Sequence, residues 1–401
     1  MSKRCLQVLV IVMAILAMAG RSGAATININ IYGASAQYLF WNDAADNFLA
    51  SIGCTNIQQA EDSSKKHGIT KGTKGADTYY IRYSSKASFD GIYSCKGQVP
   101  PPEVGGQPSC AGNPRNREMA DENNTNWATK LVNGLKCVEV TIGASDVGGE
   151  CFGQYTEGKL KGHYDRANQP YVYRNVGPID TTGMTIYKPL VVPFGFFANT
   201  AIETEVSNLT RLQAVLIFAR KAFVWSDFGP TTYPVKDIVA CLRHAGSGTH
   251  ATLDNVVFRT DTWPLATTED DWGVWFNDGS SDMMRCIEQN GGFSTDTAAA
   301  VGYADADQLV GTSSYPHVYA LNYMGASAAK ENITNCVYDF WAEQHLYECN
   351  PNDSVTHPIV LQLIAYASNP ANLPASKAAY WATQSEMLCE KANCRAYPQF
   401  K

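Results

Sequence analysis

The chain has 401 residues, of which 45% are hydrophobic, and its formal net charge at neutral pH is −7. This length is enough to bury a large core and to form two lobes or domains. The negative balance excludes proteins that hold nucleic acid or anionic membranes on a broadly basic surface. An anionic ligand would therefore need a local site built from hydrogen-bond donors and a few cations.

The first 25 residues have the pattern of a secretory signal peptide. Lys3 and Arg4 precede an apolar run from Val8 to Ala19, and small residues follow as far as Ala25, where we expect cleavage. A membrane anchor is the alternative, but the run is short for a span and no later segment has 18 continuous apolar residues. The signal holds three basic and no acidic residues, which takes the net charge from −7 to −10 in the mature chain. We expect an exported protein, periplasmic or secreted, with no lipid anchor.

Cysteine usage agrees with export. Eleven cysteines follow the signal, which is typical of disulfide bonding in an oxidising compartment. The plausible local pairs are Cys95–Cys110, Cys137–Cys151, Cys336–Cys349 and Cys389–Cys394. The connectivity stays open, and the odd count requires one cysteine that is free or bridges to another chain. The chain has neither a haem-attachment motif nor paired Cys-x-x-Cys motifs for zinc, so we expect no metal and no cofactor.

The mature chain begins with alternating strands and helices, which predicts an α/β fold. Residues 26–32 alternate as a strand, and residues 33–38 form a glycine-serine turn that opens a helix running to residue 49. Residues 79–83 form a second strand, which ends at Ser84 and Ser85. Each strand therefore ends on small polar residues.

A third strand follows a long insertion. Residues 96–126 are rich in Pro, Gly and Asn and are interpreted as a surface insertion. The next strand starts at Cys137, runs through Ile142 and ends on Ser145 and Asp146. A serine and a carboxylate thus follow this strand.

The fourth strand end holds the clearest candidate for an anion site. Residues 237–242 form a short apolar strand, residues 249–257 can form a helix, and Arg243–Thr249 joins them through an arginine and a glycine-serine loop. The glycines allow backbone N–H groups to approach a ligand, a helix N-terminus adds donors, and the guanidinium fork matches paired oxygens. A glycine-serine turn beside a surface arginine is the alternative. Because ligands collect at the carboxyl ends of strands in open α/β sheets, the four ends predict one crevice.

These motifs, in this order, resemble the phosphate-binding proteins of ATP-driven phosphate importers. Residues 191–199, 209–218, 301–303 and 320–341 also fall in that family's order. The resemblance implies a two-lobed periplasmic-binding-protein-like fold of class II, in which each lobe is a mixed sheet flanked by helices. It places the crossings between lobes near Pro193 and Tyr315. Lobe 1 then comprises residues 26–193 and 316–401, and lobe 2 comprises residues 194–315.

The resemblance also implies a site for a tetrahedral oxyanion between the lobes. Arg243 would be the fixed cation and Asp146 a hydrogen-bond acceptor. Hydrogen phosphate has a proton to donate to Asp146 and sulfate has none, so this carboxylate would select phosphate. The donors around the anion would come from Ala36, Gln37, Tyr38, Ser84, Ser247, Gly248 and Thr249.

Three positions depart from the family pattern. Ala245 stands where an aspartate usually pairs with the arginine, so we expect Arg243 to be held less firmly or to carry a stronger effective charge. Gln37 stands where threonine is common, which changes the reach of the donor. The segment Ser85–Ser88 replaces a glycine-rich run, so its backbone is expected to lie farther from the ligand.

The sequence therefore predicts a receptor that delivers phosphate to an ABC permease in the inner membrane and binds no nucleic acid. An exported phosphatase on the same scaffold is one alternative, but it would need a nucleophile or a metal cluster that the sequence does not offer, and no enzyme is expected. The other alternative is an extracellular structural or interaction protein whose anion site has diverged. The extra cysteines, the insertion and the three departures suggest this second alternative.

Overall fold

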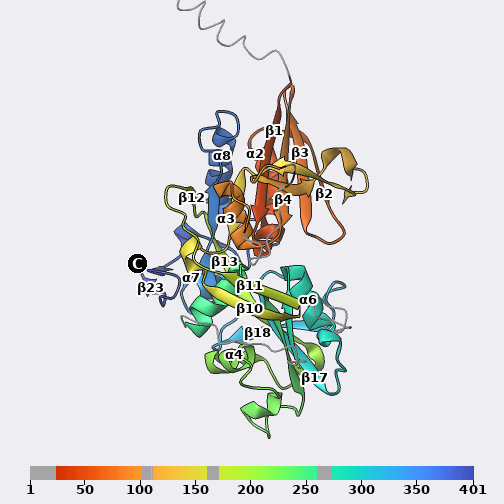
Figure 1. Cartoon of the computed structure of the whole chain (residues 1–401), viewed down its shortest axis with the longest axis vertical. Helices are drawn as coiled ribbons and strands as arrows, with labels where there is room; N and C mark the ends of the chain where they lie inside the picture. Colours follow the sequence, from red (N-terminus) through yellow and green to blue (C-terminus); the bar gives the residue numbers. More distant parts are fainter. Residues whose placement is uncertain (1–23, 101–109, 111, 160–170, 260–272) are drawn as a thin grey trace, which may run out of the picture.

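The structure is a computed structural model that describes residues 24–100, 110, 112–159, 171–259 and 273–401. Residues 1–23 of the expected signal peptide and residues 101–109 and 111 of the expected insertion lie outside the described residues. The chain forms two lobes, one above the other in Figure 1, each built on a mixed sheet with helices packed against it. Within the described residues, no helix is long and apolar enough to cross a membrane.

The first lobe contains a nine-stranded sheet. Its central strands β9, β1 and β4 are neighbours and parallel, with Gly33 opposite both Ser85 and Ala144. The ends of these three strands therefore meet at one edge, as the strand-end pattern predicts. In order across the sheet the strands are β12 (Thr185–Tyr187), β20 (His345–Glu348), β9 (Ile142–Ser145), β1 (Thr26–Gly33), β4 (Asp77–Ser85), β3 (His67–Lys74), β2 (Thr55–Glu61), β7 (Leu131–Val132) and β6 (Thr125–Asn126). Helices α2 (Tyr38–Ser51), α3 (Ser88–Lys96) and α8 (His357–Ala367) complete this lobe.

The second lobe has its own mixed sheet. All ten residues of its central strand β13 (Leu190–Asn199) are buried, which suits a continuous apolar run. The order is β14 (Asn208–Leu209), β18 (Val318–Tyr323), β13, β17 (Ala298–Asp305), β15 (Asp237–Arg243) and β16 (Val274–Asn277). The helices are α4 (Arg211–Phe218), α5 (Gly248–Thr252), which continues as a π-helix over Leu253–Phe258, α6 (Ser280–Glu288) and α7 (Lys330–Thr334). The strand and helix predicted around Arg243 are therefore present.

Two antiparallel strands carry the chain between the lobes. The first half of β13 pairs with β19 (Trp341–Glu343) and β21 (Ala382–Thr383), and from Phe194 onward β13 pairs with β17 and β18. The return passes from β19 through Gln344 into β20 of the first sheet. Pro193 stands where β13 changes partners, a position that tolerates its missing N–H. Strand β18, which follows the predicted crossing near residue 315, pairs with β13 in the sheet of the second lobe.

Three further segments differ from the sequence expectation. The strand expected from Cys137 through Ile142 is two strands, because β8 (Leu135–Glu139) pairs with β5 (Asn116–Ala120) outside the main sheet. The end of the predicted surface insertion is partly core, since Arg117 is buried and forms an ion pair of 2.8 Å with the buried Asp90 of α3. The hairpin of β10 (Gln154–Lys159) and β11 (Tyr171–Val176) packs on the second lobe, where Thr156 accepts a hydrogen bond from Ala245 N.

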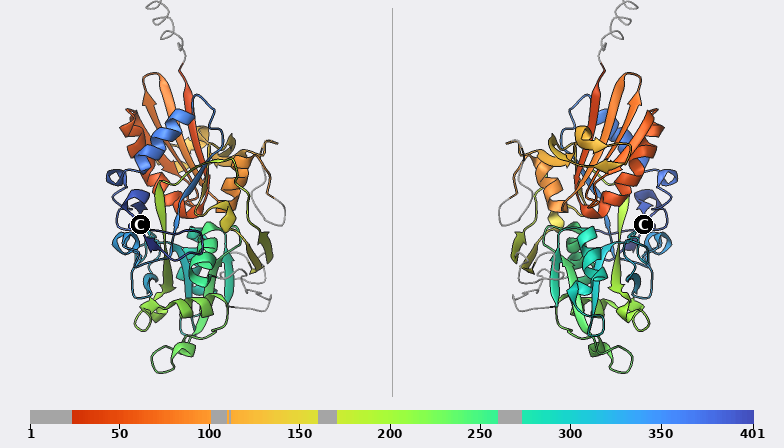
Figure 2. Two further views of the ribbon diagram at one scale, coloured as in Figure 1. Left: turned by 90° about the vertical axis from the view of Figure 1, so that its left-hand side faces the viewer. Right: turned by 90° about the vertical axis from the view of Figure 1, so that its right-hand side faces the viewer.

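Disulfides connect segments that are distant in sequence. The pairs are Cys95–Cys349, Cys110–Cys137, Cys151–Cys394, Cys241–Cys286 and Cys336–Cys389, so none of the four expected local pairs forms. Sequence proximity fails as a guide because the chain returns to the first lobe after crossing, which brings Cys349 beside Cys95. Cys54 is the odd cysteine among the described residues, and it is buried. Both side views in Figure 2 show the C-terminal end beside the junction of the lobes.

Candidate functional site

Asp146 lies where the two lobes meet and collects donors from both. It follows β9 directly and is only 1% exposed. Its carboxylate accepts hydrogen bonds from Gln37 Nε2 at 3.1 Å, Ser88 Oγ at 3.3 Å and Thr249 Oγ1 at 3.5 Å. Burial raises the pKa of Asp146 to about 6, although Gln37 and Arg243 act in the opposite direction. This carboxyl group therefore gains or loses a proton close to neutral pH.

The two walls of the site are in direct contact in this conformation. Gly248 N donates to Ser88 Oγ at 3.1 Å, and Phe89 N donates to Gly246 O at 3.1 Å. A Cβ atom on Gly248 would lie 2.4 Å from Ser88 Oγ, and Gly246 has a φ of +89°, which side chains rarely adopt. The glycines of the sequence motif thus allow the second lobe to approach the start of α3 closely.

Arg243 is the buried cation of the site. It ends β15, is 1% exposed, and its Nη1 donates to Ser35 Oγ of the first lobe at 2.9 Å. Its Nε and Nη2 donate to the carbonyl oxygens of Asn277 at 3.1 Å and Asp278 at 2.7 Å. These carbonyls fix the guanidinium although Ala245 offers no carboxylate. The guanidinium is thus held from within the second lobe by backbone carbonyls in place of a carboxylate.

A neutral histidine and a carboxylate lie among the basic groups beside Arg243. Burial and the neighbouring Arg174 lower the pKa of His244 to about 4, so this ring is neutral at pH 7. Its Nε2 lies 3.3 Å from Asp278 Oδ1. Although burial opposes the effect, His244, Lys86 and Arg174 hold the pKa of Asp278 well below its usual range. Asp278 is thus a fixed negative charge, and Arg174 and Lys86 are the basic groups that face it.

The structure brings together most of the residues predicted for the site. Gln37, Asp146, Arg243, Gly248 and Thr249 gather at the junction of the lobes, as the contacts above show. Ala36 is buried in the turn before α2. Ser247 caps α5 by accepting from His250 N at 3.3 Å.

Two side chains that were predicted for the site point away from it, and one residue of the site was not predicted. Ser84 Oγ lies 2.8 Å from His67 Nδ1 on the neighbouring strand β3, and Tyr38 donates its hydroxyl to Glu61 at 3.1 Å. Neither side chain contacts Asp146, so only their backbone groups could face a ligand. Ser88, which was not predicted, contacts Asp146 and Gly248 instead. Because Ser88 is the first residue of α3, it could be identified only once the start of that helix was known.

Gln37 connects the site to the lobe crossing. Its Oε1 accepts from Gln344 Nε2 at 2.8 Å and from Trp41 Nε1 at 3.3 Å, while its Nε2 also donates to Ser145 O at 2.9 Å. The amide thus has partners on both sides and is 0% exposed. Because Gln344 lies between β19 and β20, the side chain of Gln37 joins the crossing to Asp146.

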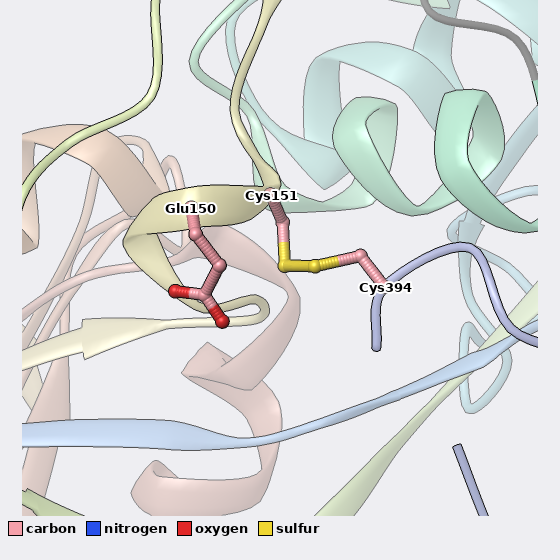
Figure 3. A group of neighbouring side chains, drawn as sticks. All are labelled: Glu150, Cys151 and Cys394. Carbon is pink, nitrogen blue, oxygen red and sulfur yellow. A yellow bond between two sulfur atoms is a disulfide. The ribbon is translucent and has the colours of Figure 1, made fainter. Parts of the chain in front are cut away.

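One group of potential metal ligands comes together within the described residues. Glu150, Cys151 and Cys394 lie close enough to share an ion (Figure 3). The two sulfur atoms are joined in a disulfide, and only a thiolate is an effective ligand. This cluster therefore cannot bind a metal while the disulfide is intact. Cys241 lies in β15, just before the 243–249 loop. Its sulfur is bonded to Cys286, so Cys241 is not a nucleophile.

Comparisons with known proteins found similarity at the level of structure. No protein-family model matches the chain, and no curated protein sequence matches it. A phosphate ABC transporter substrate-binding protein with bound phosphate from Clostridium perfringens is 13% identical, with a TM-score of 0.48 over 84% of this chain and 93% of that one.

Two other solved structures are similar to the same extent. An ABC-type phosphate transport receptor from Vibrio cholerae is 14% identical, with a TM-score of 0.43 over 86% of this chain and 94% of that one. The periplasmic phosphate-binding protein PfluDING, bound with phosphate, is 11% identical, with a TM-score of 0.49 over 88% and 89% of the two chains.

Proposed function

We propose that this protein binds phosphate between its two lobes and serves as the exported receptor of an ABC importer, whose permease lies in the inner membrane. One observation carries the proposal: Arg243 of the second lobe and Asp146 of the first are both buried at the junction, with neutral donors between them. A cation and a proton acceptor on opposite sides suit an oxyanion that is both charged and protonated. The role is binding, and no catalytic step is assigned to it.

Binding requires the walls of the site to exchange partners. Gly248 N and Ser88 Oγ bond to each other at 3.1 Å, so an ion can enter only when the lobes separate there. The released groups then bond to the ion instead, and the antiparallel crossing strands β13 and β19 are the natural hinge. Ligand binding in this proposal replaces contacts between the lobes with contacts through the ligand.

Asp146 gives the site a graded preference for phosphate over sulfate. Hydrogen phosphate supplies the proton for a hydrogen bond to Asp146, whereas sulfate binds only after Asp146 has taken a proton from solvent. With a pKa of about 6, Asp146 takes that proton at moderate cost near pH 7. The preference should therefore be strong in alkaline solution and weak in acid.

A second candidate function is an interaction protein whose anion site has diverged. The observation in its favour is that Gln37, Ser88 and Thr249 already satisfy Asp146 from within the protein. Titration calorimetry with phosphate, arsenate and sulfate at pH 7.5 separates the two. The receptor binds phosphate and arsenate at micromolar concentration or below and sulfate more weakly. Heats that are flat for all three oxyanions at millimolar concentration would overturn the proposed function and leave the second candidate.

A further inference from the structure

A cavity beside Arg243 is too large and too rich in hydroxyl groups for an inorganic ion alone. It has a volume of about 350 Å³ and is lined from both lobes. This volume lies within the range of sites for small organic molecules, whereas phosphate has five heavy atoms. Seven of its sixteen lining residues are serines, so the walls suit a ligand that makes many hydrogen bonds. The ligand class that fits such walls is a polyhydroxylated compound.

The cavity adjoins the proposed oxyanion site at one shared side chain. Ser35 lines the cavity, and its Oγ accepts from Arg243 Nη1 at 2.9 Å. Ser280 of the other lobe also lines the cavity, and its Oγ lies 3.3 Å from that of Ser35. Both serines are buried, with exposures of 7% and 5%. Because Ser35 Oγ stands between Arg243 and the cavity, a substituent on a phosphoryl group held by Arg243 would reach the cavity by displacing the contact between Ser35 and Ser280.

Two cations and one acid line the cavity. They are Lys65, Arg285 and Glu288, and Arg285 Nη1 also lies 3.7 Å from Asp282 Oδ1. Glu288 accepts a hydrogen bond from His317 N at 2.8 Å, which satisfies part of its charge. An ion pair between the lobes, from Lys66 to Asp282 at 2.9 Å, stands next to these residues. The cavity is thus assembled only when the lobes are closed, and its occupant would contact both.

We propose that the cavity receives the polyol part of a phosphate monoester whose phosphoryl group is held by Arg243. This inference rests on the proposed function, because it uses the same oxyanion site. The deprotonated ester, like sulfate, brings no proton for Asp146, so the hydroxyl contacts in the cavity must offset that cost. The ester should consequently bind far better than an ester that lacks the polyol.

Titration calorimetry with four compounds at pH 7.5 tests the inference: inorganic phosphate, methyl phosphate, glucose 6-phosphate and glucose. We expect glucose 6-phosphate to bind at least tenfold more tightly than methyl phosphate, because both carry the same phosphoryl group and only one fills the cavity. The inference is overturned if phosphate binds and the two esters bind equally. If phosphate itself does not bind, the proposed function fails first, and the two failures are thereby distinguished.

A cavity-filling variant provides the second readout. Ser281 is half-buried on the cavity wall and is not in contact with Arg243, so Ser281→Phe fills the space without touching the oxyanion site. We expect this variant to bind glucose 6-phosphate at least tenfold more weakly than the wild type and to bind inorganic phosphate with an affinity within twofold of the wild type. Unchanged phosphate binding also shows that the variant is folded. Ser313→Phe is the matched control, since Ser313 is exposed and does not line the cavity. The inference is contradicted if Ser281→Phe weakens the binding of both ligands equally, or if it weakens the binding of neither.

Discussion

Replacing Asp146 by asparagine should abolish the preference for phosphate over sulfate. In the wild-type protein, sulfate binds only after Asp146 takes a proton, and Asp146 has a pKa of about 6. At pH 7.5 that protonation costs about 2 kcal/mol, which corresponds to a preference of roughly 30-fold for the ligand that brings its own proton. An asparagine amide donates equally to either oxyanion, so the ratio should fall to near 1. Phosphate affinity itself should fall about tenfold through loss of one charge-assisted hydrogen bond.

The assay is competitive titration calorimetry of both oxyanions at fixed ionic strength. The control is Asp121→Asn, which removes another largely buried carboxylate, one that accepts from Asn123 N in the first lobe and does not contact the site. This control should keep the wild-type ratio, and melting temperatures establish that both variants are folded. A ratio in Asp146→Asn that stays within threefold of wild type would refute the proton argument.

Three further predictions concern neighbouring features. Ser88→Ala should weaken phosphate about tenfold through loss of one hydrogen bond to an anion, whereas Ser84→Ala should change it less than twofold; the reverse order in a binding titration would contradict the placement of Ser88. Because protonated Asp146 no longer repels sulfate, sulfate affinity should rise about 30-fold between pH 7.5 and pH 5. A sulfate affinity that does not change over this pH range would contradict this role of Asp146. The Cys151–Cys394 bridge spans 243 residues; replacing both cysteines by serine should lower the free energy of unfolding by about 2–5 kcal/mol, measured by denaturant titration, and an unchanged value would show that the bridge does not constrain the unfolded chain.

The local patterns predicted the strand ends well because each depends on a few neighbouring residues. The strands before Ser84, Asp146 and Arg243 form, and the glycines of the 243–249 loop serve a close approach between the walls. The choice between Ser84 and Ser88 could not be made this way. It depends on strand alternation, which turns Ser84 toward His67 of β3, and on where α3 begins.

Contacts between residues that are distant in sequence could not be predicted from local sequence patterns. Arg243 is held by carbonyls of Asn277 and Asp278, some 35 residues away, and the disulfide Cys95–Cys349 joins segments separated by the whole second lobe. Such pairings follow from how the sheets assemble and from the two crossings between lobes. The link from Gln344 to Asp146 through Gln37 has the same origin, since it depends on the return strand passing the first sheet.

A crystal structure of the protein grown with phosphate would show whether an ion binds between the lobes. We expect a phosphate ion between Arg243 and Asp146, with Ser88 Oγ and Gly248 N donating to the ion and no longer bonded to each other. An oxygen of the ion should lie within hydrogen-bond distance of the Asp146 carboxylate. Persistence of the Ser88–Gly248 hydrogen bond at saturating phosphate, with no ion between the lobes, would contradict phosphate binding at this site.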